Sequence, residues 1–375
     1  DENTFLVACK FDPKDDWSDK TAYGLYLLDT FGNHTLIYKS SDFSCWQPVP
    51  LLPRKRPPVL AMSRDPKLAE RNQAVCIVQN ISHGTEGLEP GAIKYLRIME
   101  QVPRPWGCRR CWDPHDEYGS HTALVGGGVL GLKVMHGIVP VHEDGSAHFV
   151  VPADKNIYFQ ALDENYLEVQ RERTYVNYQP GEIRSCVGCH EKPKDTPRRR
   201  GSKPMALSHP PSRPQPQPGD KTAARVLHYP TDVQPVLDKH CIKCHSGRTP
   251  KGDIDLTDTM TELFTRSFQN LSRTGLSPRI TEVSERPRST PYVPAMTIGS
   301  GASALMKMLR KGHNEVKLSK QELLKISTWI DAGCQFYGTY YGRKNIELKN
   351  HPNFRPTPTL SQATSPLPPI PEKER

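Results

Sequence analysis

Two pentapeptides of the pattern C-x-x-C-H, at residues 186–190 and 241–245, constrain this chain more than any other feature. At this spacing two thiols can form thioether bonds to the vinyl groups of one porphyrin, and the adjacent histidine can reach the iron. Each motif therefore requires a fold that surrounds a haem. The sequence predicts two c-type haems, whose covalent anchors are Cys186, Cys189, Cys241 and Cys244.

The motif histidines His190 and His245 are the expected proximal ligands of the two irons. The second haem also needs a sixth ligand from farther along the chain, where methionine would raise its reduction potential and histidine would lower it. Composition favours methionine slightly, but His313 follows a glycine in a turn between two predicted helices, from which a side chain can point over a haem face. The candidates are Met260, Met296, Met306, Met308 and His313.

Five histidines upstream of the first motif are candidates for the sixth ligand of the first haem. A lone histidine on a strand is more often a hydrogen-bonded or exposed residue than a ligand. If none of the five binds, the first iron is five-coordinate and open to a small molecule. These histidines are His115, His121, His136, His142 and His148.

The chain begins with three short strand patterns. Residues 4–9 are mostly apolar, and residues 23–28 and 34–38 flank a turn. Three strands cannot enclose a core of their own. We interpret residues 1–45 as the end of a β-propeller, or as an edge that packs on the next domain.

Short strand patterns with Gly and Pro between them continue through residues 46–191. Apolar and polar side chains alternate at residues 146–151 and 157–162, and a turn then leads into residues 166–170. This spacing is typical of an antiparallel β-sandwich. We therefore expect a β-sandwich-like middle domain that carries the first haem.

Residues 221–345 show helical patterns, between a proline-rich linker at 192–220 and a similar tail at 346–375. Asp232 is a candidate N-cap for a helix that leads into the second motif. Residues 319–322 are a capping box, and the helix that they open should end just before a glycine. The predicted fold class is a β-rich multidomain chain that ends in an α-helical cytochrome c domain.

The motifs and the composition indicate in which cellular compartment the protein works. Thioether attachment of haem takes place outside the cytoplasmic membrane, so we expect a periplasmic or other extracytoplasmic location. The chain starts at Asp1 without a signal pattern, which suggests that a signal has been removed or that the sequence is a piece of a longer protein. The most apolar stretch, 123–141, is interrupted by glycines, Lys133 and His136, so we expect no membrane span.

The chain has 50 basic and 41 acidic residues, a net charge of +9. Basic runs at 54–56 and 198–200 could steer docking with an acidic redox partner or an anionic surface, although each is more simply a solvated loop. No aromatic residues alternate with these charges, so nucleic acid is not an expected partner.

Six cysteines remain after the four haem anchors are subtracted from ten: Cys9, Cys45, Cys76, Cys108, Cys111 and Cys334. Cys108 and Cys111 have the spacing of metal ligands, and two histidines follow closely, so a zinc site is one interpretation. A disulfide or plain structural thiols are at least as plausible in an oxidising compartment. The residues leave these alternatives open.

Three segments of the middle region, residues 116–128, 145–153 and 181–191, resemble hydrazine synthase alpha-subunit-like proteins of planctomycetes. The helical region is similar to the C-terminal cytochrome domain of the same family at residues 311–313, 316–319, 329–331 and 336–342. The resemblance covers nearly the whole chain apart from the linker and the tail.

The resemblance implies an architecture and a set of ligands. Full-length members carry an N-terminal β-propeller, so residues 1–45 would be its end. The C-terminal haem of the family is bis-histidine, which makes His313 the expected sixth ligand of the second haem. In the true synthase the first haem is the active centre: a tyrosine four residues after the motif histidine binds the iron, and that histidine binds zinc.

This chain has Lys194 where that tyrosine would stand. This difference argues against the synthase reaction. Without the tyrosine, His190 is again the expected proximal ligand of the first iron. We therefore expect a dihaem c-type cytochrome that exchanges electrons with redox partner proteins, such as a cytochrome or a quinol-linked donor, with or without further subunits. The alternative is an oxidoreductase, related to hydrazine synthase, that acts on a small nitrogen or oxygen species at an open first haem.

Overall fold

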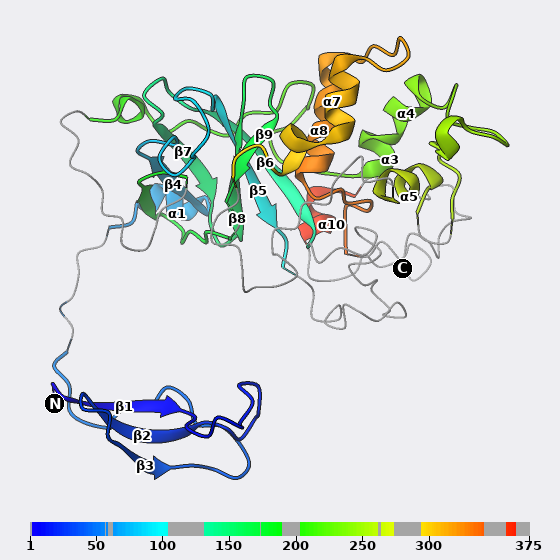
Figure 1. Cartoon of the computed structure of the whole chain (residues 1–375). Helices are drawn as coiled ribbons and strands as arrows, with labels where there is room; N and C mark the ends of the chain where they lie inside the picture. Colours follow the sequence, from blue (N-terminus) through cyan, green and yellow to red (C-terminus); the bar gives the residue numbers. More distant parts are fainter. Residues whose placement is uncertain are drawn as a thin grey trace, which may run out of the picture. The chain divides into compact units, whose positions relative to one another are not determined.

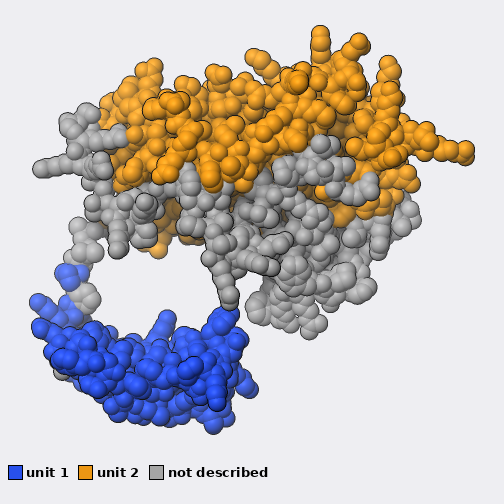
Figure 2. Space-filling view, in the orientation of Figure 1, with its two compact units in different colours: residues 1–62 blue, residues 63–375 orange. Residues whose placement is uncertain are grey.

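Residues 1–62 form one of two units into which the chain divides, and residues 63–375 form the other (Figure 2). The computed structural model describes residues 2–56, 58, 63–103, 131–172, 174–189, 203–261, 264–273, 294–340 and 358–364. None of the helices in these ranges has the length and hydrophobicity that a membrane span requires.

The first unit is a three-stranded antiparallel sheet in which β2 lies between β1 and β3. The strands are β1 (Thr4–Cys9), β2 (Gly24–Asp29) and β3 (His34–Tyr38), at the positions that the strand patterns predict. The carboxylate of Asp29 accepts hydrogen bonds from the backbone N–H groups of Phe31 and Asn33, both at 2.9 Å, and so closes the turn between β2 and β3.

This sheet leaves large apolar side chains in contact with solvent. Phe5 of β1 is 49% exposed, and Leu36 and Tyr38 of β3 are 52% and 53% exposed. A three-stranded sheet becomes stable by packing an apolar face against something else. The assignment of these strands to the end of a propeller explains the exposed residues and stays a prediction.

Two sheets form the β-rich part of the second unit (Figure 1). The smaller sheet has the order β10-β4-β7, with β4 (Gln73–Val78), β7 (Ala147–Pro152) and β10 (Ile183–Cys186). The larger has the order β11-β6-β5-β8-β9, with β5 (Tyr95–Gln101), β6 (Lys133–Pro140), β8 (Ile157–Leu162), β9 (Glu168–Arg171) and β11 (Arg225–Val226). With the sheet of the first unit, these confirm the β-rich part of the predicted fold class.

Apolar side chains from both sheets of the second unit share one core. Phe149 of β7 and Phe159 of β8 meet edge to face, with ring centroids 5.3 Å apart. Cys76 of β4 and Ile98 of β5 are fully buried in the same cluster. The two sheets therefore pack face to face in a sandwich-like arrangement.

One strand departs from the antiparallel order that the sequence predicts. β10 lies parallel to β4, with Arg184 opposite Cys76. The other strand pairs in the described part of the chain are antiparallel. A parallel pair needs a long connection, and about a hundred residues separate β4 from β10, so local alternation carries no signal for this pairing.

The described part of the proline-rich segment, residues 203–220, packs on both sheets. The backbone N–H of Ser212 donates to the carbonyl of His148 at 2.8 Å, and Gln215 and Ile138 exchange two backbone hydrogen bonds of 2.9 Å. Backbone hydrogen bonds thus hold this segment on both sheets, and residues 205–208 of it form a 3-10 helix. Its described residues are therefore part of the folded unit.

The remaining elements are short helices: α1 (Pro66–Glu70), α3 (Tyr229–Asp232), α4 (Gln234–His240), α5 (Arg266–Arg273), α6 (Gly299–Ala302), α7 (Ala304–Lys311), α8 (Lys320–Asp331), α10 (Leu360–Thr364), and the 3-10 helices η2 (Met205–Ser208) and η3 (Lys251–Asp253).

The predicted capping box of α8 is confirmed. Ser319 Oγ accepts from the backbone N–H of Glu322 at 3.2 Å, and the Glu322 carboxylate accepts from the Ser319 N–H at 2.8 Å. Gly333, with φ of 85°, follows the helix as predicted.

The predicted N-cap at Asp232 is wrong. Asp232 is the last residue of α3, and α4 begins two residues later without a side-chain cap. The Asp232 carboxylate instead accepts hydrogen bonds from the backbone N–H of His228 and from Arg225, both at 3.0 Å. Pro230 in the first turn favours an earlier helix start, a signal that the prediction did not use.

A buried polar network joins the helices to the larger sheet. Arg97 of β5 and Asp331 of α8 form an ion pair of 2.9 Å, and both side chains are 0% exposed. Asp331 Oδ1 also accepts from the backbone N–H of Ser300 in α6 at 2.7 Å. Its backbone carbonyl accepts from Gln160 of β8 at 2.7 Å and from Arg171 of β9 at 2.6 Å. The end of α8 is therefore fixed on the sheet.

Candidate functional site

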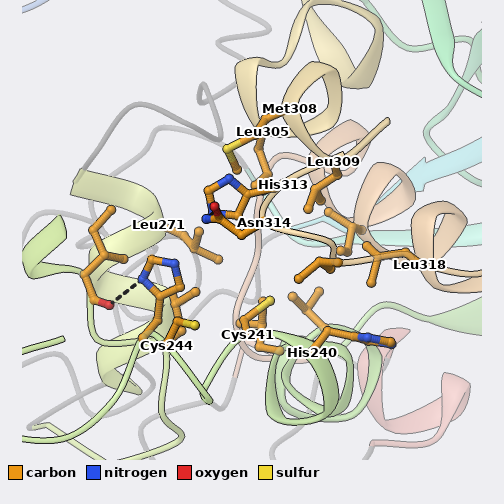
Figure 3. A pocket seen from close by; sticks show the side chains of 17 residues that line it. His240, Cys241, Cys244, Leu271, Leu305, Met308, Leu309, His313, Asn314 and Leu318 are labelled. Carbon is orange, nitrogen blue, oxygen red and sulfur yellow. Dashed lines mark hydrogen bonds between the residues drawn. The ribbon is translucent and has the colours of Figure 1, made fainter. Parts of the chain in front are cut away.

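The second C-x-x-C-H motif forms one tight turn directly after α4. The backbone N–H of Cys241 donates to the carbonyl of Leu237 at 2.7 Å. The N–H groups of Cys244 and His245 both donate to the carbonyl of Cys241, at 3.1 and 3.0 Å. These bonds bring both thiols and the imidazole to the wall of one cavity (Figure 3).

This cavity has a volume of about 920 Å³, part of it open to solvent. Burial raises the pKa of the Cys241 thiol to about 11, so the thiol is neutral at pH 7. The deepest part is lined by the buried apolar side chains of Val233, Leu237, Leu256, Leu271, Leu305 and Ile326.

His245 is oriented by a hydrogen bond on its far side. Its Nδ1 lies 3.2 Å from the carbonyl oxygen of Ile254, to which it donates in the neutral tautomer. A metal-binding histidine is commonly fixed in this way, because the donating nitrogen leaves the lone pair on the other one. Nε2 of His245 is thus the nitrogen that can bind a metal.

His313 faces His245 across the cavity. The two ring centroids are 6.2 Å apart and the ring planes differ by 23°. Two imidazoles that bind one iron from opposite sides have centroids about 6 Å apart, because a metal–nitrogen bond is about 2 Å and the centroid lies about 1 Å behind the nitrogen. The spacing of the pair therefore fits one metal atom between them.

A tight turn positions His313 after α7. The backbone N–H of Val316 donates to the His313 carbonyl at 2.9 Å, and the two central residues, Asn314 and Glu315, have φ of 47° and 66°. Asn314 Nδ2 donates to Nε2 of His313 at 3.2 Å, so the lone pair of this nitrogen is engaged by Asn314, and this hydrogen bond would have to break for Nε2 to bind a metal. Figure 3 shows His313 and Asn314 side by side at the cavity.

The methionine candidates differ in their access to this cavity. Met308 lines it, together with His313. Met306 is 1% exposed and packs in the hydrophobic core, and neither Met260 nor Met296 is among the lining residues. Of the five sequence candidates, the geometry brings His313 and Met308 to the site, and His313 is the one that faces His245.

The first C-x-x-C-H motif begins at the last residue of β10. Cys186 and Cys189 pack against the core that the two sheets share. Burial raises the pKa of the Cys189 thiol. Contact with Cys186, followed by burial, raises the pKa of the Cys76 thiol, so a third thiol lies at this motif. His190 and Lys194 lie outside the described residues.

His83 is a neighbour of the first motif that the sequence analysis missed. Its carbonyl accepts a hydrogen bond from the backbone N–H of Cys189 at 3.0 Å. A Cβ atom at Gly188 would lie 2.4 Å from that same oxygen, so only glycine fits there. His83 and Cys189 are far apart in the sequence, and no pattern around residue 83 predicts their contact.

Residues 91–191 match the family model of the hydrazine synthase alpha subunit middle domain. The chain contains a hydrazine synthase alpha-like middle domain. The matched range holds β5 to β10 and the whole first C-x-x-C-H motif, which confirms the resemblance drawn from the sequence.

A solved structure of Kuenenia stuttgartiensis hydrazine synthase is similar over 89% of this chain, with a TM-score of 0.59 and 17% sequence identity. At that identity the similarity shows the fold alone. The chain spans 54% of the length of that solved chain, about half. Among curated proteins, none matches.

The described histidines of the hydrazine synthase alpha-like domain have partners away from the first motif. His136 Nε2 lies 2.8 Å from the carboxylate of Glu100. His148 Nδ1 lies 3.1 Å from the carbonyl of His209, and His142 stacks on the ring of His209. All three therefore have other partners in the structure, while His115 and His121 lie outside the described residues.

The zinc hypothesis concerns residues that the structure does not describe, because Cys108 and Cys111 lie outside the described ranges. Within those ranges, no group of three or more His, Cys, Asp or Glu side chains is arranged to hold a metal. None of the eight described cysteines forms a disulfide. The zinc and disulfide alternatives for Cys108 and Cys111 stay predictions.

His240, which precedes the motif, lines the cavity and ties α4 to α8. Its Nε2 lies 3.0 Å from Glu322 Oε1, and Lys239 Nζ lies 2.9 Å from the same oxygen. The hydrogen bond from Lys239, with others from Ser319 and His240, holds the pKa of Glu322 well below its usual range. Glu322 thus couples α4 to the cap of α8.

We expect Glu322→Gln to lower the free energy of unfolding by about 1 kcal/mol at pH 7. Because the folded pKa lies below the unfolded value of about 4.3, the stabilisation is present above that pH and is lost as the pH falls below it. Urea titrations from pH 7 to pH 3 measure this, with exposed Glu89→Gln as the control. A difference between Glu322→Gln and wild type that stays constant down to pH 3 would contradict the assignment.

Proposed function

We propose that the chain is a dihaem c-type cytochrome protein, related to the hydrazine synthase alpha subunit, that transfers electrons outside the cytoplasm. The observation that carries the proposal is the pair of imidazoles, His245 and His313, facing each other at 6.2 Å across an apolar cavity. Cys241 and Cys244 line the same cavity, where they would anchor the second haem.

The residues of the second site fit a haem in three respects. The cavity is apolar, two thiols at the attachment spacing line it, and two imidazoles face each other at the distance that one metal requires. When bound, the haem supplies a one-electron iron couple. His245 and His313 would hold the iron, and ligation by two histidines would lower its reduction potential.

We assign residues 221–345 to a cytochrome c domain on the same grounds, and Cys186, Cys189 and His190 to the first haem. The extracytoplasmic location follows from the chemistry of haem attachment. The donor would be a cytochrome or a quinol-linked protein, and further subunits would complete the assembly.

We expect the two cysteine pairs to hold one covalent haem each. The double variant Cys241→Ala with Cys244→Ala should lose one of two haems, and Cys186→Ala with Cys189→Ala should lose the other. The measurement is the mass of the denatured chain, together with haem absorbance per chain. Cys76→Ala is the matched control and should keep both haems. If either double variant kept two haems, the cysteine pair substituted in it would not be a haem attachment site.

A second candidate function is a haem redox enzyme, hydrazine synthase-like, at an open first haem. The observation that favours it is that His136, His142 and His148, three candidates for the sixth ligand of the first haem, have other partners in the structure. Carbon monoxide binding by the ferrous wild-type protein separates the candidates. A five-coordinate first haem binds the gas, and two six-coordinate haems do not.

A further inference from the structure

The mouth of the second haem cavity is formed by two chain segments. Its deep lining residues are buried, and Asn314 is exposed. The partly exposed lining residues lie at the end of α4 and in the chain after it (His240, Cys241, Cys244, His245, Ile254), and in α7 and the chain after it (Met308, Leu309, His313, Val316, Leu318). We call the two segments, residues 238–253 and 307–320, the basic rim.

The basic rim holds most of the excess charge of the chain. It contains nine Lys or Arg residues and three acidic residues, Asp238, Asp253 and Glu315, and therefore six of the nine excess positive charges. All nine basic residues are exposed. Lys239 pairs with Glu322, and the other eight form no ion pair with any described residue. The positive charge around the cavity is thus not neutralised by the described part of the chain.

We propose that the basic rim is the docking surface of an acidic one-electron carrier protein. This inference rests on the proposed function, because it places the partner against the second haem. Clustered positive charge around the mouth would attract an acidic surface and orient it with the cavity at the centre of the contact. Attraction of this kind raises the association rate and weakens as salt screens it.

Two other kinds of anionic partner fit the rim less well. No large apolar side chain in the rim is exposed, so there is nothing to insert into a lipid bilayer. The rim contains no Phe, Tyr or Trp, so it has no platform on which nucleic acid bases could stack. An acidic protein, held by polar and salt-sensitive contacts, is therefore the anionic partner that fits the rim.

The test is the rate at which the second haem is reduced by an acidic probe protein, a reduced plant-type ferredoxin, in stopped-flow mixing with the full chain. The variant Arg248→Glu with Lys317→Glu reverses one charge on each segment of the rim. The matched control, Lys67→Glu with Lys94→Glu, makes the same change in net charge on the β-rich part. Unchanged spectra of the second haem show that both variants keep the site.

We expect the rim variant to be reduced about tenfold more slowly than wild type at low ionic strength, and the difference to vanish at high salt. The control should stay within about twofold of wild type. Equal slowing of both variants would overturn the proposal, because net charge alone would explain it. Rates that do not depend on salt would also overturn it, as would binding to phosphatidylserine vesicles without any effect on the ferredoxin rate. If dithionite also fails to reduce the second haem, the proposed function fails rather than the docking surface.

Discussion

Replacing His313 with alanine will turn the second haem from a six-coordinate, low-spin centre into a five-coordinate one whose ferrous form binds carbon monoxide. The expectation follows from the 6.2 Å separation of the His245 and His313 rings, which leaves space for one iron and its two bonds. Without His313, the distal side of the cavity presents apolar side chains, Asn314 and the thioether of Met308. Absorption spectra with and without the gas measure the change, from no binding at this haem to one molecule per haem.

Met308→Leu is the matched control for His313→Ala, because Met308 lines the same cavity and is the other sequence candidate that reaches it. This substitution conserves volume and should leave both the spectrum and the gas binding of the second haem unchanged. If Met308→Leu opened the iron while His313→Ala did not, methionine would be the sixth ligand and the proposed ligation would be wrong.

Asp331→Ala will cause a large loss of stability at a position away from the cavity. The carboxylate pairs with Arg97 at 2.9 Å, and both side chains are completely buried. Removing one partner of a buried pair leaves an uncompensated charge, which costs about 3–5 kcal/mol. Ser300 of α6 loses its acceptor as well. Urea titration of the full chain should show the main unfolding transition at a much lower midpoint.

Arg266→Ala gives the comparison for Asp331→Ala, since Arg266 pairs with Asp255 while 55% exposed. An exposed pair contributes about 0–1 kcal/mol, so this variant should unfold close to wild type. Asp331→Asn keeps the shape and some hydrogen bonds and should fall between the two. Equal midpoints for Asp331→Ala and Arg266→Ala would show that the junction between sheet and helices does not depend on the buried pair.

Much of the local structure follows from local sequence. The apolar run at residues 4–9 and the alternation at residues 157–162 predict the observed limits of β1 and β8. The capping box at Ser319 started α8 because its two hydrogen bonds involve residues three apart. Such signals depend only on residues that are close in sequence, so they predict local structure whatever the tertiary fold.

The features that sequence did not reveal arise from contacts between distant residues. The parallel pairing of β10 with β4 and the contact of His83 with Cys189 join residues about a hundred positions apart. Arg97 and Arg171 are fully buried on strands because Asp331 and Glu168 neutralise them, and nothing in their own strands signals this. α6 has the sequence GSGA, whose glycines disfavour a helix, and Ser300 holds it through tertiary bonds.

For the candidate site, the motif spacing identified the anchors and His245, while residue patterns alone left the sixth ligand undecided between methionine and His313. The family resemblance selected His313, and the structure then placed its ring opposite His245. The roles of Ile254 as hydrogen-bond acceptor and of His240 in the cavity wall came from the structure, since neither follows from a spacing.

The most direct test of the central claim is near-infrared magnetic circular dichroism of the ferric protein, in which the energy of the porphyrin-to-iron charge-transfer band identifies the axial ligands of low-spin haem. The measurement should be made on the variant Cys186→Ala with Cys189→Ala, so that the second haem alone contributes. We predict a single band at the energy of bis-imidazole ligation, lost in His313→Ala. A band at the energy of histidine–methionine ligation, or a high-spin spectrum, would contradict the assignment of His245 and His313 as the two ligands.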